Sequence, residues 1–171
     1  MLALFAAVLA TSNPAPLLEA SVPWWERITV IVDDKGLQQS CKYQSSLSPS
    51  GAEECDKDMA DSIPTSGAKG PSGVHSKLTF ERRFSPGGKP DSGKLEPGDK
   101  LLGRQVLFLT IDSEGSITSC RVVATAGDMP PDYNCEQAKT EQFQAQASAD
   151  SGAPRQAFMT VLAYGHMEQV A

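Results

Sequence analysis

Four cysteines at repeated spacings are the residues of this chain best suited to chemistry. Cys41 and Cys55 are 14 residues apart (55 − 41), and Cys120 and Cys135 are 15 apart (135 − 120). Redox pairs favour the closer Cys-x-x-Cys spacing, and structural zinc sites need four ligands in paired clusters. The pattern therefore predicts two structural disulfides, Cys41–Cys55 and Cys120–Cys135, with pairing between the two halves of the chain as the alternative. We expect no bound metal and no cofactor.

Other reactive side chains give no catalytic pattern. His75 and His166 have no carboxylate or cysteine at a useful spacing, which is typical of ordinary surface residues. Asp33 and Asp112 could suggest a pair of catalytic carboxylates, but each opens an Asp-x-x-Gly turn that accounts for it. The chain has no Gly-x-Ser-x-Gly elbow and no phosphate-binding loop. We therefore expect no catalytic residue and a protein that is not an enzyme.

The elements that would position these residues occur twice. Each copy is an apolar strand, an Asp-x-x-Gly turn and a second strand that ends near a cysteine. The matched residues are 79 positions apart (112 − 33, 115 − 36 and 120 − 41): Asp33 with Asp112, Gly36 with Gly115, and Cys41 with Cys120. Aspartate can bond its own backbone in such a turn, and glycine supplies the left-handed residue. The pattern indicates an internal duplication and two small units, which often need covalent staples.

Each repeat predicts the order strand, turn, strand, loop, helix, loop, strand. Capping boxes open the two expected helices, one at Ser50 with Glu53 and one at Asn134 with Gln137. The fold class expected is α+β: two tandem β-β-α-β modules, each a short antiparallel sheet covered by one helix. The expected organisation is an apolar segment at 1–20, a first module at 24–84, a Pro- and Gly-rich linker at 85–99 and a second module at 100–168.

Composition and the N-terminal segment point to export. The chain has 171 residues and a formal net charge of −6 with no long basic run, so nucleic acids and anionic membrane surfaces are poor partners. Leu2–Ala10 has the length of a signal-peptide core and is too short to span a bilayer. No basic residue precedes it. We expect a signal cleaved between Ala10 and Ala20 and a periplasmic protein without a membrane span in the mature chain. The alternative is an apolar segment of the folded domain.

The order of motifs in the second repeat resembles the TonB C-terminal domain family. The residues that carry the resemblance are Phe108, Asp112, Gly115, Val122, Gly127, Phe143, Gly152 and Pro154. The first repeat matches more loosely, through Asp33, Gly36, Cys41, Cys55 and Gly73. Some members carry cysteines at the end of the second strand and at the helix start, like Cys120 and Cys135. The chain shows neither the membrane anchor nor the long Pro-rich spacer of a full TonB protein, so the resemblance implies the module and not energy transduction.

The resemblance implies a binding function. Modules of this kind take up peptides that add a strand to an exposed sheet edge. The expected edges are 155–164 in the second repeat and Lys77–Arg82 in the first; the alternative is that these two edges pair with each other. The predicted function is a non-enzymatic envelope protein that binds a protein or peptide, as an accessory to TonB-type transport. The alternatives are an exported small α+β enzyme or enzyme inhibitor, and a structural envelope protein without a specific ligand.

Overall fold

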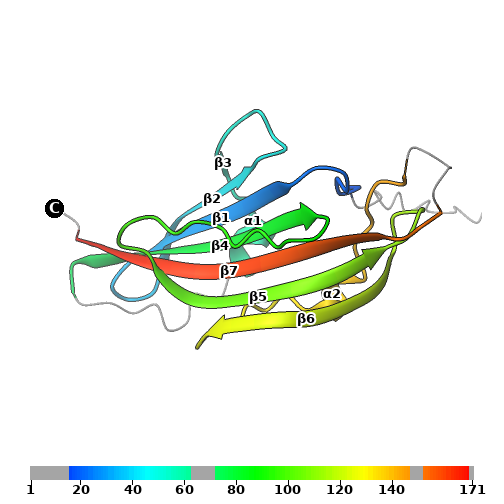
Figure 1. Ribbon diagram of the computed structural model, residues 1–171. Coiled ribbons are helices and arrows are strands. Elements are labelled where there is room, and N and C mark those ends of the chain that lie inside the picture. Colours follow the sequence, from blue (N-terminus) through cyan, green and yellow to red (C-terminus); the bar gives the residue numbers. More distant parts are fainter. Residues whose placement is uncertain (1–15, 63–71, 147–151, 170–171) are drawn as a thin grey trace, which may run out of the picture.

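The computed structural model describes residues 16–62, 72–146 and 152–169 and contains one long, twisted, antiparallel sheet (Figure 1). Its seven strands follow the order β3-β2-β1-β4-β7-β5-β6. The elements are β1 (Trp24–Val32), β2 (Gln38–Ser45), β3 (Glu53–Glu54), α1 (Lys57–Ser62), β4 (Val74–Pro86), β5 (Lys100–Ile111), β6 (Ile117–Gly127), α2 (Cys135–Ala138) and β7 (Arg155–Gln169). No helix among these residues is long and apolar enough to cross a membrane.

The predicted α+β class is wrong, because strand makes up 53% of the structure and helix only 5%. The capping box of Asn134 and Gln137 is present, yet α2 has four residues. The chain after it runs extended, and the backbone N–H of Phe143 donates to the carbonyl of Gly115 (2.9 Å). In the first repeat Glu53 pairs with Tyr43 in β3 instead of opening a helix. A short helix is marginal by itself, so sheet pairing and burial of Phe143 decide the conformation.

The duplication extends to the register of the strands. In the first repeat Val30 lies opposite Cys41 of β2 and Leu78 of β4. In the second repeat Leu109 lies opposite Cys120 of β6 and Ala157 of β7. Each pair of counterparts is again 79 residues apart (109 − 30, 120 − 41 and 157 − 78). The two repeats therefore build the same three-stranded unit, in the same register up to an extra residue of β6, Val123, that has no counterpart in the first repeat.

The third strands of the two repeats join the units into one sheet. β4 pairs antiparallel with β7 along the whole of its own length, with Arg82 opposite Val161. Val161 is also the counterpart of Arg82 in the duplication (161 − 82 = 79), so a pseudo-twofold axis passes through this pair. β7 is bonded to β4 on one side and to β5 on the other. The prediction of a free edge at 155–164 is therefore wrong, and so is that at Lys77–Arg82, which lies between β1 and β7.

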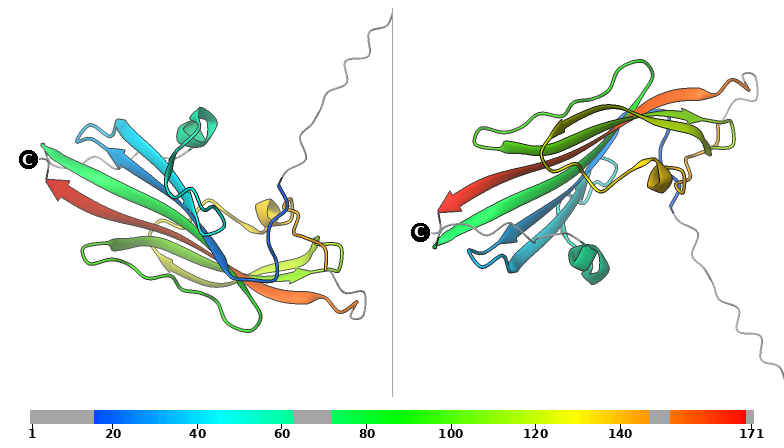
Figure 2. Two further views of the ribbon diagram at one scale, coloured as in Figure 1. Left: turned by 90° about the horizontal axis from the view of Figure 1, so that it is seen from above. Right: turned by 90° about the horizontal axis from the view of Figure 1, so that it is seen from below.

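The sheet has two unlike faces, because successive side chains of a strand point to opposite sides. Both helices lie on one side, which we call the helix face, and the segment 87–99 crosses the other, which we call the linker face (Figure 2). The main hydrophobic cluster lies on the helix face and includes Trp24, Phe84, Leu107, Leu109, Ile111, Phe143 and Met159. A smaller cluster in the first repeat contains Val30, Val32 and Cys41. The main core therefore draws side chains from both repeats.

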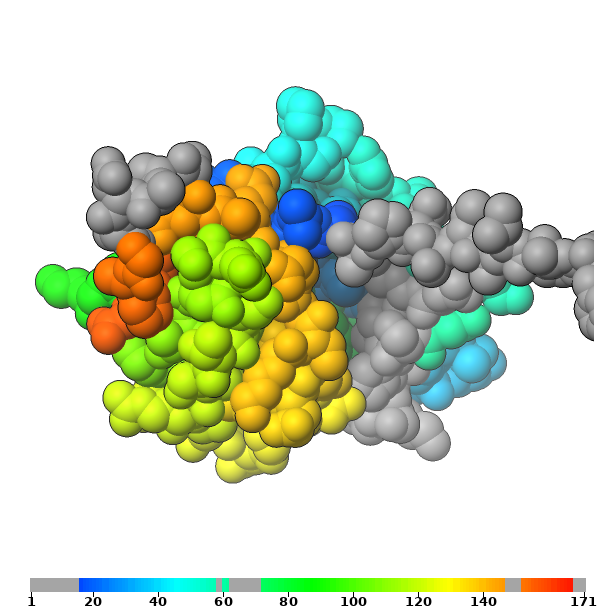
Figure 3. Space-filling model, turned by 90° about the vertical axis from the view of Figure 1, so that its right-hand side faces the viewer, coloured from blue at the N-terminus to red at the C-terminus, as the bar shows by residue number. Residues whose placement is uncertain are grey.

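The segment before β1 is part of the fold. Leu18 forms a parallel bridge with Phe143, and the indole N–H of Trp24 donates to the carbonyl of Glu19 (2.8 Å). Figure 3 shows this segment in blue against the residues that follow α2, in orange, at one end of the molecule. The predicted signal core, Leu2–Ala10, lies outside the described residues, so export stays a prediction.

Candidate functional site

The two predicted disulfides are present, and the alternative pairing between repeats does not occur. Cys41–Cys55 joins β2 to the segment before α1, with a Cα–Cα distance of 5.4 Å. Cys120–Cys135 joins β6 to the first residue of α2, with a Cα–Cα distance of 5.5 Å. Closing a loop of this length contributes about 3 kcal/mol in the chain-entropy model. The cysteines therefore have a structural role.

The paired aspartates lie in two equivalent turns. A carboxylate oxygen of Asp33 accepts hydrogen bonds from the backbone N–H groups two and four residues later, at 2.9 and 2.8 Å. Asp112 does the same, at 3.0 and 2.9 Å. The bond from the residue four positions later is the main reason that the pKa of Asp33 lies below its usual value. Gly36 and Gly115 close the turns with φ values of +82° and +92°.

The aromatic and loop residues of the family resemblance lie at the end of the main core. Phe143 is fully buried and packs against the ring of Phe84 (centroid distance 5.1 Å). A Cβ atom on Gly115 would lie 2.0 Å from the carbonyl oxygen of Phe143, so the turn and the aromatic residue fit only with glycine. Gly152 and Pro154 lie exposed in the segment before β7. These residues build the fold.

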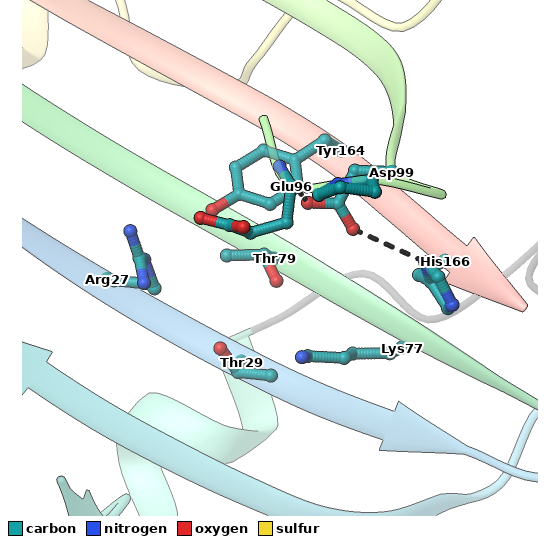
Figure 4. A pocket seen from close by; sticks show the side chains of 9 residues that line it. Arg27, Thr29, Lys77, Thr79, Glu96, Asp99, Tyr164 and His166 are labelled. Atoms are coloured by element: carbon teal, nitrogen blue, oxygen red, sulfur yellow. Dashed lines mark hydrogen bonds and ion pairs between the residues drawn. The ribbon is translucent and has the colours of Figure 1, made fainter. Parts of the chain in front are cut away.

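A polar pocket lies on the linker face, between the strands and the segment that connects the two repeats (Figure 4). Its volume is about 180 Å³, and its lining comprises Arg27, Thr29, Lys77, Thr79, Glu96, Pro97, Asp99, Tyr164 and His166. His166 Nδ1 lies 3.6 Å from a carboxylate oxygen of Asp99. Sequence reasoning missed this partner, because the two residues are 67 positions apart (166 − 99) and no local spacing relates them. His75, which lies opposite Glu168, is not in the lining.

A buried carboxylate holds the floor of the linker face together. Glu81 is 3% exposed, and its oxygens contact Arg27 Nε (2.8 Å), Arg83 Nη1 and the hydroxyl of Tyr164, which donates at 2.9 Å. Burial, and then the charge of Glu81, raise the pKa of Tyr164 well above its usual value. The cluster connects β1 and β4 of the first repeat with β7 of the second. Nothing in the sequence pattern signals it, since all four residues are far from any motif.

A second cluster lies on the helix face at the pseudo-twofold axis. Arg82 forms ion pairs with Glu26 of the first repeat and Glu141 of the second. Its guanidinium also lies over the rings of Trp24 and Tyr133, at 5.4 and 5.3 Å. This cluster borders a shallow apolar groove of about 340 Å³. Arg82 thus ties the repeats together on the face opposite to Glu81.

The outer edges of the sheet differ between the repeats. At the first edge, β3 covers Lys42 and Tyr43 of β2. At the other edge, β6 is the last strand, and no described strand lies beyond it. Its segment Val122–Gly127 carries no charged residue, and the side chains of Val122 and Val123 are 48% and 41% exposed. Long, uncharged, exposed edges are templates for pairing with another chain.

Within the described ranges, no group of three His, Cys, Asp or Glu side chains could hold a metal ion. A search of protein-family models, of characterised proteins and of solved structures returns no match to this chain. The resemblance to the TonB C-terminal domain therefore stays a prediction based on its motifs. The fold leaves two features open to a ligand, the β6 edge and the linker-face pocket.

Proposed function

We propose that this chain is a non-enzymatic protein of the cell envelope that binds an extended peptide segment of a partner protein at the β6 edge. The observation that carries the proposal is the segment Val122–Gly127, which is uncharged and has no described strand on its outer side. An incoming strand would receive the backbone hydrogen bonds that β6 directs away from β5, and the exposed Val122 and Val123 would contact its side chains. The bound peptide would extend the sheet by one strand.

The shape of β6 supports recognition of a particular partner over indiscriminate pairing. The register with β5 shifts between Val106 and Leu107, so that Val123 is an extra residue on β6. A bulge of this kind twists an edge strand and limits how a flat strand can pair with it. Cys120, near the start of β6, is bonded to α2. The free part of the edge therefore begins after the disulfide and has room for a short segment only.

The compartment that we propose is the periplasm. Two disulfides and no free cysteine in the described chain suit an oxidising compartment. The motif resemblance suggests that the partner takes part in TonB-type transport, with a periplasmic peptide of an outer-membrane receptor as the ligand. Mass spectrometry of unreduced protein from its native cell tests the compartment, and four free thiols there would contradict it.

The peptide proposal is tested with hydrogen–deuterium exchange. Synthetic peptides from the periplasmic segments of outer-membrane receptors are added, and the exchange of the amides of 121–127 is followed. A bound strand should slow the exchange of alternate amides, because only every second N–H of β6 points outward. The substitution Ala124→Lys places a charge on the edge and should weaken binding about tenfold, or ~1.4 kcal/mol.

The matched control is Gln39→Lys on β2, which adds the same charge to an exposed position at the opposite edge. It should leave peptide affinity unchanged. Protection at β2 with none at β6, or equal affinity for both variants, would refute the proposal. Self-association of the protein through β6 without peptide binding would show that the edge serves a second copy of the chain, and would refute it too.

A further inference from the structure

Two of the charged side chains that line the linker-face pocket have no ion-pair partner among the described residues. Lys77 on β4 and Glu96 on the connecting segment line it, and neither forms an ion pair with any described residue. The other charges are occupied. Arg27 Nε is bonded to Glu81. Asp99 faces His166, accepts a hydrogen bond from the backbone N–H of Glu96 (3.0 Å), and has a side chain that is only 10% exposed.

The two unpaired charges enter the pocket from different parts of the structure. Lys77 lies on the sheet together with the hydroxyl-bearing Thr29 and Thr79, whereas Glu96 belongs to the segment above them (Figure 4). The sheet side thus offers an ammonium and two hydroxyls, all of which can donate to a carboxylate. Arg27 of β1 lies on the same side, with its Nε bonded to Glu81 and its guanidinium over the ring of Trp25 (4.9 Å). The segment side offers a carboxylate that can accept from an ammonium.

We infer that this pocket binds a small zwitterion of the free α-amino acid class. Such a ligand carries one carboxylate for Lys77 and one ammonium for Glu96. The volume of about 180 Å³ suits a small ligand such as an amino acid with a short side chain. The inference is independent of the β6 edge.

Ligands of a single charge fit less well. An inorganic anion would lie near the carboxylates of Glu96 and Asp99, and a simple cation would lie near Lys77 and Arg27. Each end of a peptide carries one charge only, so it would leave either Lys77 or Glu96 without a partner. A charged group of the site that a ligand leaves without a partner costs binding free energy, so the site should discriminate strongly against ligands with a single charge. The charge pattern therefore favours a molecule with both groups.

Isothermal titration calorimetry on the full chain tests the inference, with glycine, L-alanine and L-serine as probes. Propionate and ethylamine are the matched single-charge analogues of L-alanine. L-Alanine should bind, and about tenfold more tightly than either analogue. Lys77→Met and Glu96→Gln should each weaken amino acid binding about tenfold, since a hydrogen bond to a charged group contributes roughly that much.

Two substitutions of the same kinds away from the pocket serve as controls. Lys35→Met and Glu114→Gln alter exposed residues in the two Asp-x-x-Gly turns, and both should bind like the original protein. Thermal unfolding without ligand shows whether each variant folds, and shifts of the amide resonances of Thr29 and Thr79 on ligand addition locate the site. Absence of binding for all three amino acids, equal binding of propionate and L-alanine, or full affinity in folded Lys77→Met would overturn the inference. Ala124→Lys on β6 should keep amino acid binding, so this site and the peptide edge fail or succeed separately.

Discussion

Replacing Phe84 with alanine tests whether the two repeats form one cooperative unit. Phe84 belongs to β4 of the first repeat and is fully buried. It stacks on Trp24 (centroid distance 5.5 Å) and packs against Phe143 of the second repeat (5.1 Å). Its cluster includes Leu107 and Met159, which also belong to the second repeat. Phe84→Ala should therefore destabilise both repeats together.

The cost follows from the burial. A buried Phe→Ala change loses about 3–5 kcal/mol, a large part of the roughly 5–15 kcal/mol that stabilises a typical protein. With a urea dependence of about 2 kcal/mol per molar, the unfolding midpoint should fall by roughly 2 M. Tryptophan fluorescence reports on Trp24 and Trp25 of β1, whereas far-ultraviolet circular dichroism reports on all strands. Both probes should give the same lowered midpoint.

The control for this experiment is Phe158→Ala. Phe158 lies on the linker face in an edge-on contact with Phe108 (5.2 Å), and both rings are only partly buried. This change should cost less than Phe84→Ala, because the ring is only partly buried and loses, beyond that burial, an aromatic contact worth about 1 kcal/mol. If Phe84→Ala shifted the fluorescence transition but left much of the circular dichroism transition in place, the repeats would be independent and the reasoning from the shared core would be refuted.

Three further predictions concern the staples, the turns and the tyrosines. Cys120→Ser with Cys135→Ser, and Cys41→Ser with Cys55→Ser, should each lower the free energy of unfolding by about 3 kcal/mol in urea titrations, because the closed loops are nearly equal in length. Gly115→Ala should destabilise far more than Gly51→Ala in thermal unfolding: both have positive φ, but a Cβ at Gly115 meets a carbonyl oxygen at 2.0 Å and one at Gly51 meets nothing. Burial raises the pKa of Tyr43, Tyr133 and Tyr164. The folded state therefore keeps protons that the unfolded state loses above about pH 10, so stability should be intact below that pH and fall above it, with tyrosine absorbance changing only on unfolding.

The strands and staples could be predicted from the sequence because their signals are local. Alternating apolar residues and the Asp-x-x-Gly turns place β1, β2, β5 and β6, and the repeated cysteine spacing indicates both disulfides. The two helices expected to cover the sheets were predicted wrongly, because capping signals such as that of Asn134 mark where a helix begins and not how far it continues. The length of α2 is limited by Phe143, which enters the core on an extended segment paired with Leu18 and Gly115. Those contacts join parts of the chain that are far apart in sequence.

The linker-face pocket could not be predicted from the sequence, because it too is built from residues that are far apart along the chain. Pairing of β4 with β7 brings Lys77 opposite His166, and the connecting segment then adds Glu96 and Asp99. None of these residues stands at a spacing that predicts a pocket. The sequence allowed two arrangements of the third strands, free or paired with each other, and local propensity is the same in both. Only the tertiary structure distinguishes them.

The duplication explains why the two remaining edges need not have the same function. Because β4 and β7 pair with each other, the outer strands of the two three-stranded units are the equivalent strands β2 and β6. On β2, Tyr43 pairs with Glu53 of β3. Its counterpart on β6 is Val122 (122 − 43 = 79), which has no such partner among the described residues and is 48% exposed. A symmetric pair of binding edges would keep both strands alike, whereas here one edge is covered and the other is uncharged and open. This difference between two otherwise equivalent strands is the strongest structural reason to place a partner at β6.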